Sequence, residues 1–169
     1  CFYATDSPGT DGRLKKTPED FLVEELPAVT GSEGPYLICR LTKRDWDTPR
    51  VIRELAKRLG VSHRRFGWAG TKDKNAVTRQ LISVYGIAPE QVAAISLRDV
   101  QIEVIGHSPS ALALGDLAGN RFRITIRDIL PGDTGPVIRE VHDAATQGLP
   151  NYFGNQRFGV IRPITHLVG

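Results

Sequence analysis

A single carboxylate stands between two lysines in a turn that contains glycine. Residues 70–74 read GTKDK, and the run AVTRQ at 76–80 follows as the start of an alternating strand. The ammonium groups of Lys72 and Lys74 favour the ionised form of Asp73, so this residue is predicted to act as a carboxylate rather than as an acid at neutral pH. The same pattern is also typical of a solvated turn, and spacing alone leaves both interpretations open.

Positive charge is concentrated around this turn. The formal net charge of the 169 residues is +3, which is too small to indicate a partner. Residues 40–80, however, hold 12 Lys/Arg against 4 Asp/Glu, whereas residues 1–39 hold 3 against 7 and residues 81–169 hold 7 against 8. Such a surplus is typical of a surface that contacts phosphate, with a solvated basic helix face over 53–58 as the alternative.

A second segment combines groups that suit nucleic-acid recognition. Residues 150–159 read PNYFGNQRFG, which places amides, an arginine and aromatic rings among glycines that let a backbone approach a ligand. Such side chains hydrogen-bond base edges, bind phosphate and stack on bases, although an aromatic cluster after a helix is also typical of a core plug. The candidates are Asn151, Tyr152, Phe153, Gln156, Arg157 and Phe158.

Several other classes of site find no support in the sequence. Cys1 and Cys39 form no CxxC pair, which fits a reducing compartment, and we expect a cytoplasmic protein. The four histidines lack the close spacing of a zinc site, and no GxGxxG or GxxxxGK[ST] loop occurs, so neither a metal nor a nucleotide cofactor is predicted. These residues contain no run of about 20 apolar residues, so no membrane span is predicted within them.

The hydrophobic pattern predicts the elements that position these residues. Strands are predicted at 21–25, 36–41, 66–69, 76–85, 100–105 and 121–127, and helices at 48–60, 89–95 and 136–148. Thr48 is predicted to cap the first helix and Gly60 to end it. Paired strands and separate helices indicate an α+β fold, with a mixed, mostly antiparallel sheet and helices packed on it.

Two apolar faces follow from the periodicity. In the strand at 121–127, Phe122, Ile124 and Ile126 share one face. In the last helix, Val137, Ile138, Val141, Ala144 and Ala145 are predicted to point inward.

Four motifs in one order resemble the TruD family of tRNA pseudouridine synthases. They are LKKTPEDF at 14–21, GTKDK at 70–74 with AVTRQ at 76–80, GNRF at 119–122, and PNYFGNQRFG at 150–159. The tail RPITHL at 162–167 resembles archaeal members more than bacterial ones. The resemblance implies that residues 1–169 are the N-terminal portion of a pseudouridine synthase catalytic domain. The fold would then be incomplete here, with an inserted domain and the remainder beyond residue 169.

The resemblance also implies roles for individual residues. Asp73 would be the catalytic carboxylate, and Asn120 would fix its neighbourhood. Phe122 would pack beside the target base, which is compatible with its apolar face if that face forms the floor of a cleft. Lys15 matches the family's N-terminal basic residue, a partner for the carboxylate or for phosphate, although its neighbour Lys16 could be confused with it.

The reaction implied is isomerisation of uridine to pseudouridine, at position 13 of tRNA, after the base has been flipped out of its stack. The resemblance makes tRNA the expected partner. Because the isomerisation consumes no cosubstrate, no cofactor is expected. The residues expected to contact RNA are Lys72, Lys74, Arg64, Arg65 and Arg79, together with the six candidates in 150–159.

Two other functions stay open. A catalytically silent RNA-binding module of the same fold would not need Asp73, Asn120 and Phe122 in combination. A metal-assisted nuclease would need two or more further carboxylates near Asp73, and residues 55–89 contain no other Asp or Glu.

Overall fold

The computed structural model describes residues 9–28, 33–130, 132 and 134–148. The elements are η1 (Pro18–Asp20), β1 (Phe21–Pro27), β2 (Tyr36–Arg44), α1 (Thr48–Leu59), η2 (His63–Arg65), β3 (Phe66–Trp68), β4 (Val77–Tyr85), α2 (Pro89–Ala93), β5 (Val100–Ser108), β6 (Leu117–Ile124) and α3 (Gly135–Gln147). All predicted strands and helices are present, but β6 begins and ends earlier than the predicted 121–127. The chain divides into two units, Gly12–Asp128 and a second made of Cys1–Asp11 with Ile129–Gly169.

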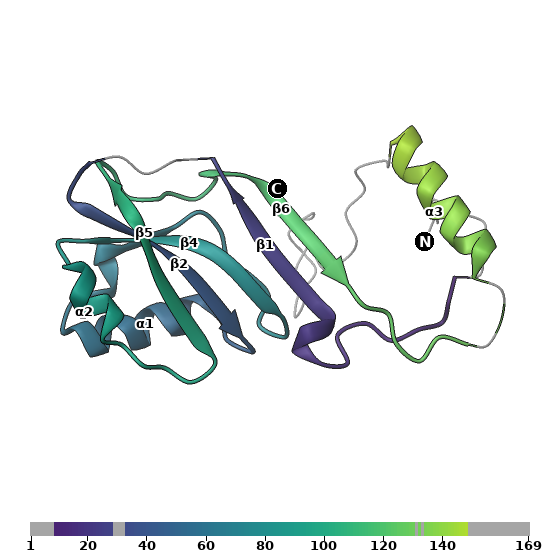
Figure 1. The fold of residues 1–169 in the computed structure, drawn as a ribbon, viewed down its shortest axis with the longest axis horizontal. Helices are drawn as coiled ribbons and strands as arrows, with labels where there is room; N and C mark the ends of the chain where they lie inside the picture. The colour runs from purple at the N-terminus through teal and green to yellow at the C-terminus, as the bar shows by residue number, and fades with distance from the viewer. Residues whose placement is uncertain (1–8, 29–32, 131, 133, 149–169) are drawn as a thin grey trace, which may run out of the picture. The chain divides into compact units, whose positions relative to one another are not determined.

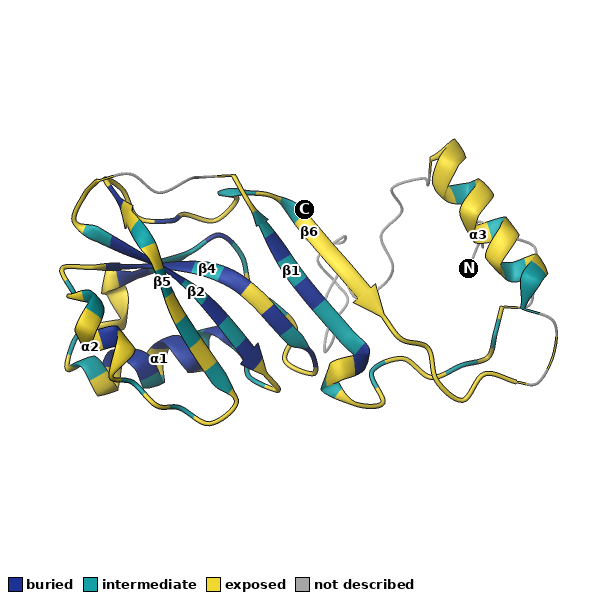
Figure 2. Cartoon of the chain, in the orientation of Figure 1, coloured by how far each residue is buried: buried dark blue, intermediate teal, exposed yellow. Residues whose placement is uncertain are grey.

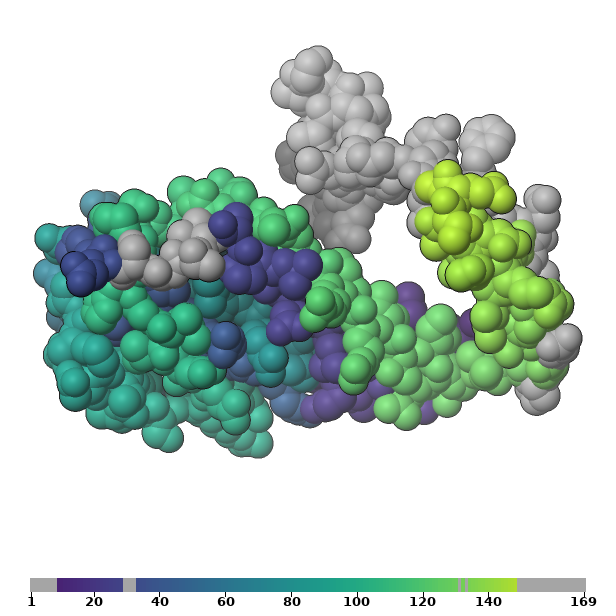
Figure 3. Space-filling view, turned by 45° about the horizontal axis from the view of Figure 1, so that its top comes forward, coloured from purple at the N-terminus to yellow at the C-terminus, as the bar shows by residue number. Residues whose placement is uncertain are grey.

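The strands of the first unit form one mixed sheet. Their order is β5-β2-β4-β1-β6 (Figure 1). In addition, β3 pairs with the second half of β4. Among the described strands, the pairing of β1 with β4 is parallel and the other pairings are antiparallel. The predicted fold class is therefore confirmed. The space-filling view shows the purple N-terminal segment against green residues from β6, although the two lie far apart in the sequence (Figure 3).

The core lies on one face of β2, β4 and β5, under α1 and α2 (Figure 1). The predicted apolar face of α1 is buried there: Val51, Ile52 and Leu55 are each exposed by 1% or less. Burying one such side chain contributes roughly 1.5–3 kcal/mol to the transfer free energy. Gly60 ends α1 with a φ of +67°, as predicted, because glycine adopts this left-handed conformation without a Cβ penalty.

The predicted N-terminal cap of α1 is wrong. Asp47 occupies the cap position, and Thr48 is the first helical residue. The Thr48 side chain is fully buried, and its Oγ1 lies 3.0 Å from Oε1 of Gln80 on β4. A hydroxyl engaged in this way holds α1 against the sheet, so Thr48 serves packing between elements rather than capping.

Two predicted apolar faces are not buried by the described residues. Phe122, Ile124 and Ile126 are 54%, 46% and 47% exposed, and Figure 2 shows most of β6 as exposed. In α3, which belongs to the second unit, Ile138 and Val141 are 64% and 57% exposed, so the prediction that they point into a core is wrong for this part of the chain. Periodicity predicts that a face is apolar but does not supply the surface that covers it.

A close approach of two backbones fixes β3, which leads into the Asp73 turn. A Cβ added to Gly67 would collide with the main-chain oxygen of Leu112 and with Oγ of Ser83, which accepts a hydrogen bond from the Leu112 N–H. We therefore expect Gly67→Ala to lower the free energy of unfolding by about 1–3 kcal/mol, the usual cost of overpacking. Thermal unfolding of the full-length protein measures this.

The matched control is Gly106→Ala on β5, where an added Cβ meets no atom within 4 Å. This change should leave the midpoint of unfolding unchanged or slightly higher, because alanine loses less backbone entropy than glycine on folding. Equal effects of the two substitutions would contradict the steric argument.

Candidate active site

Asp73 lies in the connection between β3 and β4, at the edge of the core. Its side chain is 49% exposed, and its Oδ1 lies 3.2 Å from Nζ of Lys15, which is 32% exposed. Neither flanking lysine, whose charges were expected to favour the ionised form of Asp73, forms an ion pair with it: Lys72 pairs with Glu25, and Lys74 makes no ion pair with the described residues. The cation beside Asp73 comes instead from a segment much earlier in the chain.

Lys15 adopts an unusual backbone conformation. Its φ of +54° lies in the left-handed region, which non-glycine residues rarely occupy. Its Nζ also lies 4.0 Å from the centre of the Phe21 ring, a cation–π geometry. The neighbouring Lys16 contacts Asp128, with Nζ 2.9 Å from Oδ2. The two adjacent lysines therefore have separate partners, and only Lys15 faces Asp73.

A buried carboxylate anchors the segment that carries Lys15. Asp20 is 1% exposed; its Oδ2 accepts a hydrogen bond from the Thr17 N–H at 3.0 Å, and its Oδ1 accepts one from Nε of Arg127 at 2.7 Å. Burial acts to raise the pKa of Asp20, but these hydrogen bonds and the guanidinium charge outweigh it and hold that pKa below its ordinary value. Arg13 and Arg127 also pair through their backbones. These contacts fix the path of the chain on both sides of Lys15.

Lys72 and Glu25 form a buried ion pair below the turn. Nζ of Lys72 lies 2.6 Å from Oε2 of Glu25, and their side chains are 6% and 1% exposed. The other oxygen, Oε1 of Glu25, accepts a hydrogen bond from the Leu81 N–H at 3.2 Å. The predicted contact of Lys72 with RNA does not fit this geometry, since its ammonium group is buried and paired. Lys72 instead ties the Asp73 turn to β1.

Polar groups of the core hold the turn from the other side. Nε2 of Gln80 donates to the Gly70 carbonyl at 3.0 Å, and the Lys72 N–H lies 3.4 Å from Oγ1 of Thr48. Both Thr48 and Gln80 are buried, so the turn is fixed to α1 and β4. The chain conformation around Asp73 is thus set by groups that are shielded from water.

An aromatic surface lies next to the Lys15–Asp73 pair. Phe122 on β6 pairs in register with Val23 on β1, and its ring meets that of Phe21 edge to face, with the centroids 6.0 Å apart. Phe122 is 54% exposed, so part of its surface is accessible to a ligand. The structure therefore brings together Asp73, Lys15, Phe21 and Phe122.

Asn120 belongs to the same face of the sheet. It pairs in register with Glu25, and β-strand alternation puts Asn120, Phe122 and Phe21 on one side. Asn120 is exposed and makes no side-chain hydrogen bond with the described residues. Its amide can thus bind a ligand on this face.

The other predicted RNA contacts lie elsewhere. Arg64 and Arg65 are exposed in η2, next to Phe66, which pairs with Val84 near the end of β4. At a rise of about 3.3 Å per residue, Val84 lies roughly 20 Å along β4 from the end of this strand that adjoins the Asp73 turn. Residues 150–159 lie outside the described residues.

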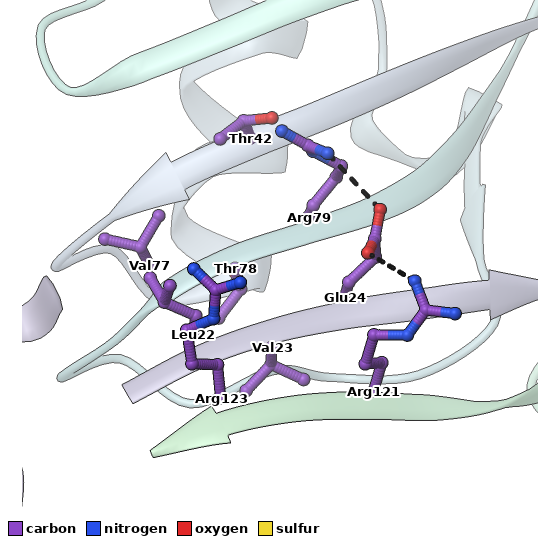
Figure 4. Close-up of a pocket in the computed structure, with 9 residues that line it drawn as sticks. All are labelled: Leu22, Val23, Glu24, Thr42, Val77, Thr78, Arg79, Arg121 and Arg123. Carbon is purple, nitrogen blue, oxygen red and sulfur yellow. Dashed lines mark hydrogen bonds and ion pairs between the residues drawn. The ribbon is translucent and has the colours of Figure 1, made fainter. Parts of the chain in front are cut away.

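Arg79 lies on the opposite face of the sheet. There a hollow of about 300 Å³ is lined by three arginines and one carboxylate (Figure 4). Glu24 bridges two of the arginines, with its oxygens 3.2 Å from Nη1 of Arg79 and 3.4 Å from Nη1 of Arg121. Arg123 makes no ion pair with the described residues. This face is basic, but it is separate from the face that carries Asp73.

Other types of site find little support among the described residues. No group of three or more His, Cys, Asp or Glu side chains there could hold a metal ion. Burial raises the pKa of the Cys39 thiol to about 12, so this cysteine is not a nucleophile at neutral pH. No helix in the described part of the chain is both long and apolar enough to cross a membrane.

The Lys72–Glu25 pair leads to a testable expectation. Replacing Lys72 with Met leaves the Glu25 carboxylate buried without its cation, and breaking one side of such a pair typically costs about 3–5 kcal/mol. Native-state hydrogen exchange should therefore become faster at the Leu81 N–H, whose acceptor is Glu25. Lys74→Met is the control. Comparable exchange in the two variants would mean that the pair does not stabilise this region.

Comparisons with known proteins agree with the motifs. The family model described as "tRNA pseudouridine synthase D (TruD)" matches residues 1–169. The chain is 46% identical over 172 residues to the "Probable tRNA pseudouridine synthase D" of Methanosarcina mazei, which covers 99% of this chain and 39% of that protein. The protein of the same name from Archaeoglobus fulgidus is 46% identical over 168 residues, covering 99% and 40%.

A solved structure agrees as well. The crystal structure of the TruD protein from Methanosarcina mazei matches with a TM-score of 0.91 and 45% identity, over 99% of this chain and 40% of that one. The chain thus spans about two fifths of the length of the curated relatives it matches.

Proposed function

The chain belongs to the TruD family of tRNA pseudouridine synthases, and we propose that the full-length protein isomerises uridine to pseudouridine in tRNA. In this proposal the uridine is the one at position 13, and Asp73 is the catalytic carboxylate. Residues 1–169 form the N-terminal portion of the catalytic domain, and the remaining part and an inserted domain complete the RNA cleft.

The observation that carries the proposal is an open carboxylate paired with a cation that itself lies against an aromatic surface. Asp73 is half exposed and its Oδ1 lies 3.2 Å from Nζ of Lys15, so a substrate can reach a carboxylate oxygen that lies beside a cation. Phe122, which is 54% exposed, offers an accessible aromatic side chain on the same side. Stacking of a base on an aromatic ring contributes roughly 1–3 kcal/mol, which offsets the few kcal/mol needed to flip a base out of its stack.

The chemistry assigned to Asp73 is compatible with this arrangement. Its carboxylate attacks the uridine, on the ribose or on the base, or assists the departure of the base. The bond between C1′ and N1 breaks, the base turns, and a bond between C1′ and C5 forms. The proton on C5 is then lost to a base, and N1 gains a proton. The reaction is an isomerisation, so no oxidant, reductant or cosubstrate is needed.

The loss of the C5 proton provides the test. The full-length protein is incubated with unmodified tRNA whose uridines carry tritium at C5, with a chelator present throughout. Release of tritium to water is expected, together with pseudouridine at position 13 of the product. Release from another uridine would change the substrate site, and no release from any tRNA would overturn the proposed activity.

A catalytically silent RNA-binding module is the second candidate. It predicts that the protein binds tRNA and releases no tritium. The pairing of Asp73 with Lys15 beside exposed Phe122 and Asn120 favours the enzyme, because a binder gains nothing from an anion on a surface that meets phosphate. The metal-assisted nuclease has no observation in its favour among the described residues.

A further inference from the structure

A buried lysine lies beneath the candidate catalytic residue. Lys43 occupies the end of β2 on the face that packs under α1, in line with Leu41 and Cys39, and its residue is 0% exposed. It makes no ion pair with a carboxylate among the described residues. A buried cation without a counter-ion is costly, so its ammonium group must be stabilised by other groups.

The groups that stabilise it are main-chain carbonyls. Nζ of Lys43 donates to the Trp46 oxygen at 2.6 Å and to the Asp73 oxygen at 2.9 Å, and the Lys72 oxygen lies 3.5 Å away. Trp46 belongs to the connection between β2 and α1, whereas Lys72 and Asp73 belong to the turn. One ammonium group therefore joins the two segments.

This contact differs from the others that hold the turn. Gln80 binds the Gly70 carbonyl, Thr48 lies at the Lys72 N–H, and Asp45 donates its N–H to the Ala76 carbonyl at 3.2 Å. Among the described residues, Lys43 alone contacts the main chain of Asp73 with a side-chain group. The direction of the Asp73 side chain depends on where that main chain lies.

We propose that Lys43 is a positioning residue, which holds the main chain of Asp73 so that its carboxylate stays at the distance from Lys15 and Phe122 that the reaction requires. The proposal rests on the proposed function, because it assigns Lys43 to the site of that reaction. A displacement of about 1 Å in such a site can lower turnover about 10²-fold. Lys43 itself is too deeply buried to touch the substrate.

The protonation of Lys43 gives the proposal a distinctive pH dependence. Burial lowers the pKa of Lys43 from 10.5 to about 8, with Asp47 and Asp73 acting to raise it and Lys72 acting to lower it. Above this pH the amine is neutral, so it loses one N–H donor and its attraction for the carbonyl oxygens. Turnover should therefore fall as the pH rises through about 8.

Stability should change in the opposite sense. The pKa is lower in the folded state than in the unfolded chain, so between about pH 8 and 10.5 the unfolded state binds more protons. The contribution of Lys43 to the free energy of unfolding consequently rises with pH over this window. A loss of turnover there cannot then be attributed to unfolding through this residue.

The test compares Lys43→Met with Thr78→Val in the full-length protein. Thr78 pairs in register with Lys43 and is equally buried, and its hydroxyl has no hydrogen-bond partner in the described residues. Lys43→Met is expected to lower kcat about 10²-fold, with KM and RNA affinity changed less than about twofold, and to remove the alkaline fall. Thr78→Val is expected to match the parent. Unchanged kcat and pH profile in folded Lys43→Met would overturn the proposal.

Two further measurements cover the remaining outcomes. If Lys43→Met does not fold, hydrogen exchange and the pH profile of the parent decide together, because protected amides at 72–76 and a kcat with no fall at any alkaline pH would contradict the assignment. If the parent releases no tritium, the proposed function fails on its own, and hydrogen exchange decides whether Lys43 holds the turn. Faster exchange at the amides of 72–76 in Lys43→Met, with the β2–β4 amides unchanged, supports the positioning role, and equal exchange overturns it.

Discussion

Asp73→Asn should lower kcat for uridine isomerisation by at least about 10³-fold, while the affinity for tRNA changes little. Asparagine has nearly the same shape as aspartate but carries no charge, so it can neither attack as a nucleophile nor accept a proton as a carboxylate does. The affinity for RNA rests mainly on Lys and Arg contacts to phosphate, which the substitution leaves in place. The prediction therefore separates catalysis from binding.

Tritium release under single-turnover conditions measures the chemical step, and filter binding at a fixed salt concentration measures affinity. Asp45→Asn is the matched control, because Asp45 is exposed in the nearby β2–α1 connection and its φ of +54° is one that asparagine tolerates. It makes the same change of charge at a similar place and should retain the parent's kcat. Full activity of Asp73→Asn would remove Asp73 from the catalytic role.

Much of the fold was predictable because its signals are local. The alternation in 76–80 and the apolar periodicity of α1 can each be read within one element, and Gly60 ends that helix for a reason that involves only its own backbone. The position of Asp73 in a turn between two strands was predictable in the same way, whereas its catalytic role is implied only by the family resemblance and stays a prediction. The observed ends of a strand differ from the predicted ends where pairing with a neighbouring strand, rather than the local pattern, sets its length. This is the case for β6, which was predicted at 121–127 and spans Leu117–Ile124.

The environment of Asp73 was less predictable because it is made by distant parts of the chain. The flanking lysines were the obvious counter-ions, but Lys72 is drawn inward by Glu25, and Lys15 reaches Asp73 from the segment before β1. Sequence neighbours of a turn residue can face either side of the backbone. Which of them meets the carboxylate depends on the tertiary fold.

Two buried charges did leave a signal that can be found in the sequence. Lys43 continues the period-two run of Leu37, Cys39 and Leu41, and Glu25 continues that of Val23. A charge at a position where the pattern requires an apolar residue indicates a buried polar contact. The pattern alone could not show that both charges lie beneath the same turn, because that depends on the pairing of β1 and β2 with β4.

The second large effect is expected from Lys15, with its own neighbour as the control. Lys15→Met keeps an apolar side chain on the Phe21 ring but removes the cation 3.2 Å from Asp73, so kcat should fall about 10²-fold. Lys16→Met removes the same charge from a partly exposed pair with Asp128, and such pairs contribute about 0–1 kcal/mol. Its kcat should stay within about twofold of the parent, and equal losses in the two variants would contradict the assignment.

A third substitution at the same position separates activity from stability. Lys15 has a φ of +54°, a conformation that costs a non-glycine residue free energy and persists where other contacts impose it. Lys15→Gly removes this backbone strain together with the ammonium group. It should unfold at the same temperature as Lys15→Met or higher, yet show the same loss of kcat in tritium release. If Lys15→Gly were both more stable and more active than Lys15→Met, Lys15 would act through its backbone conformation. If Lys15→Gly is stable but as inactive as Lys15→Met, the contribution of Lys15 to catalysis lies in the charge beside Asp73.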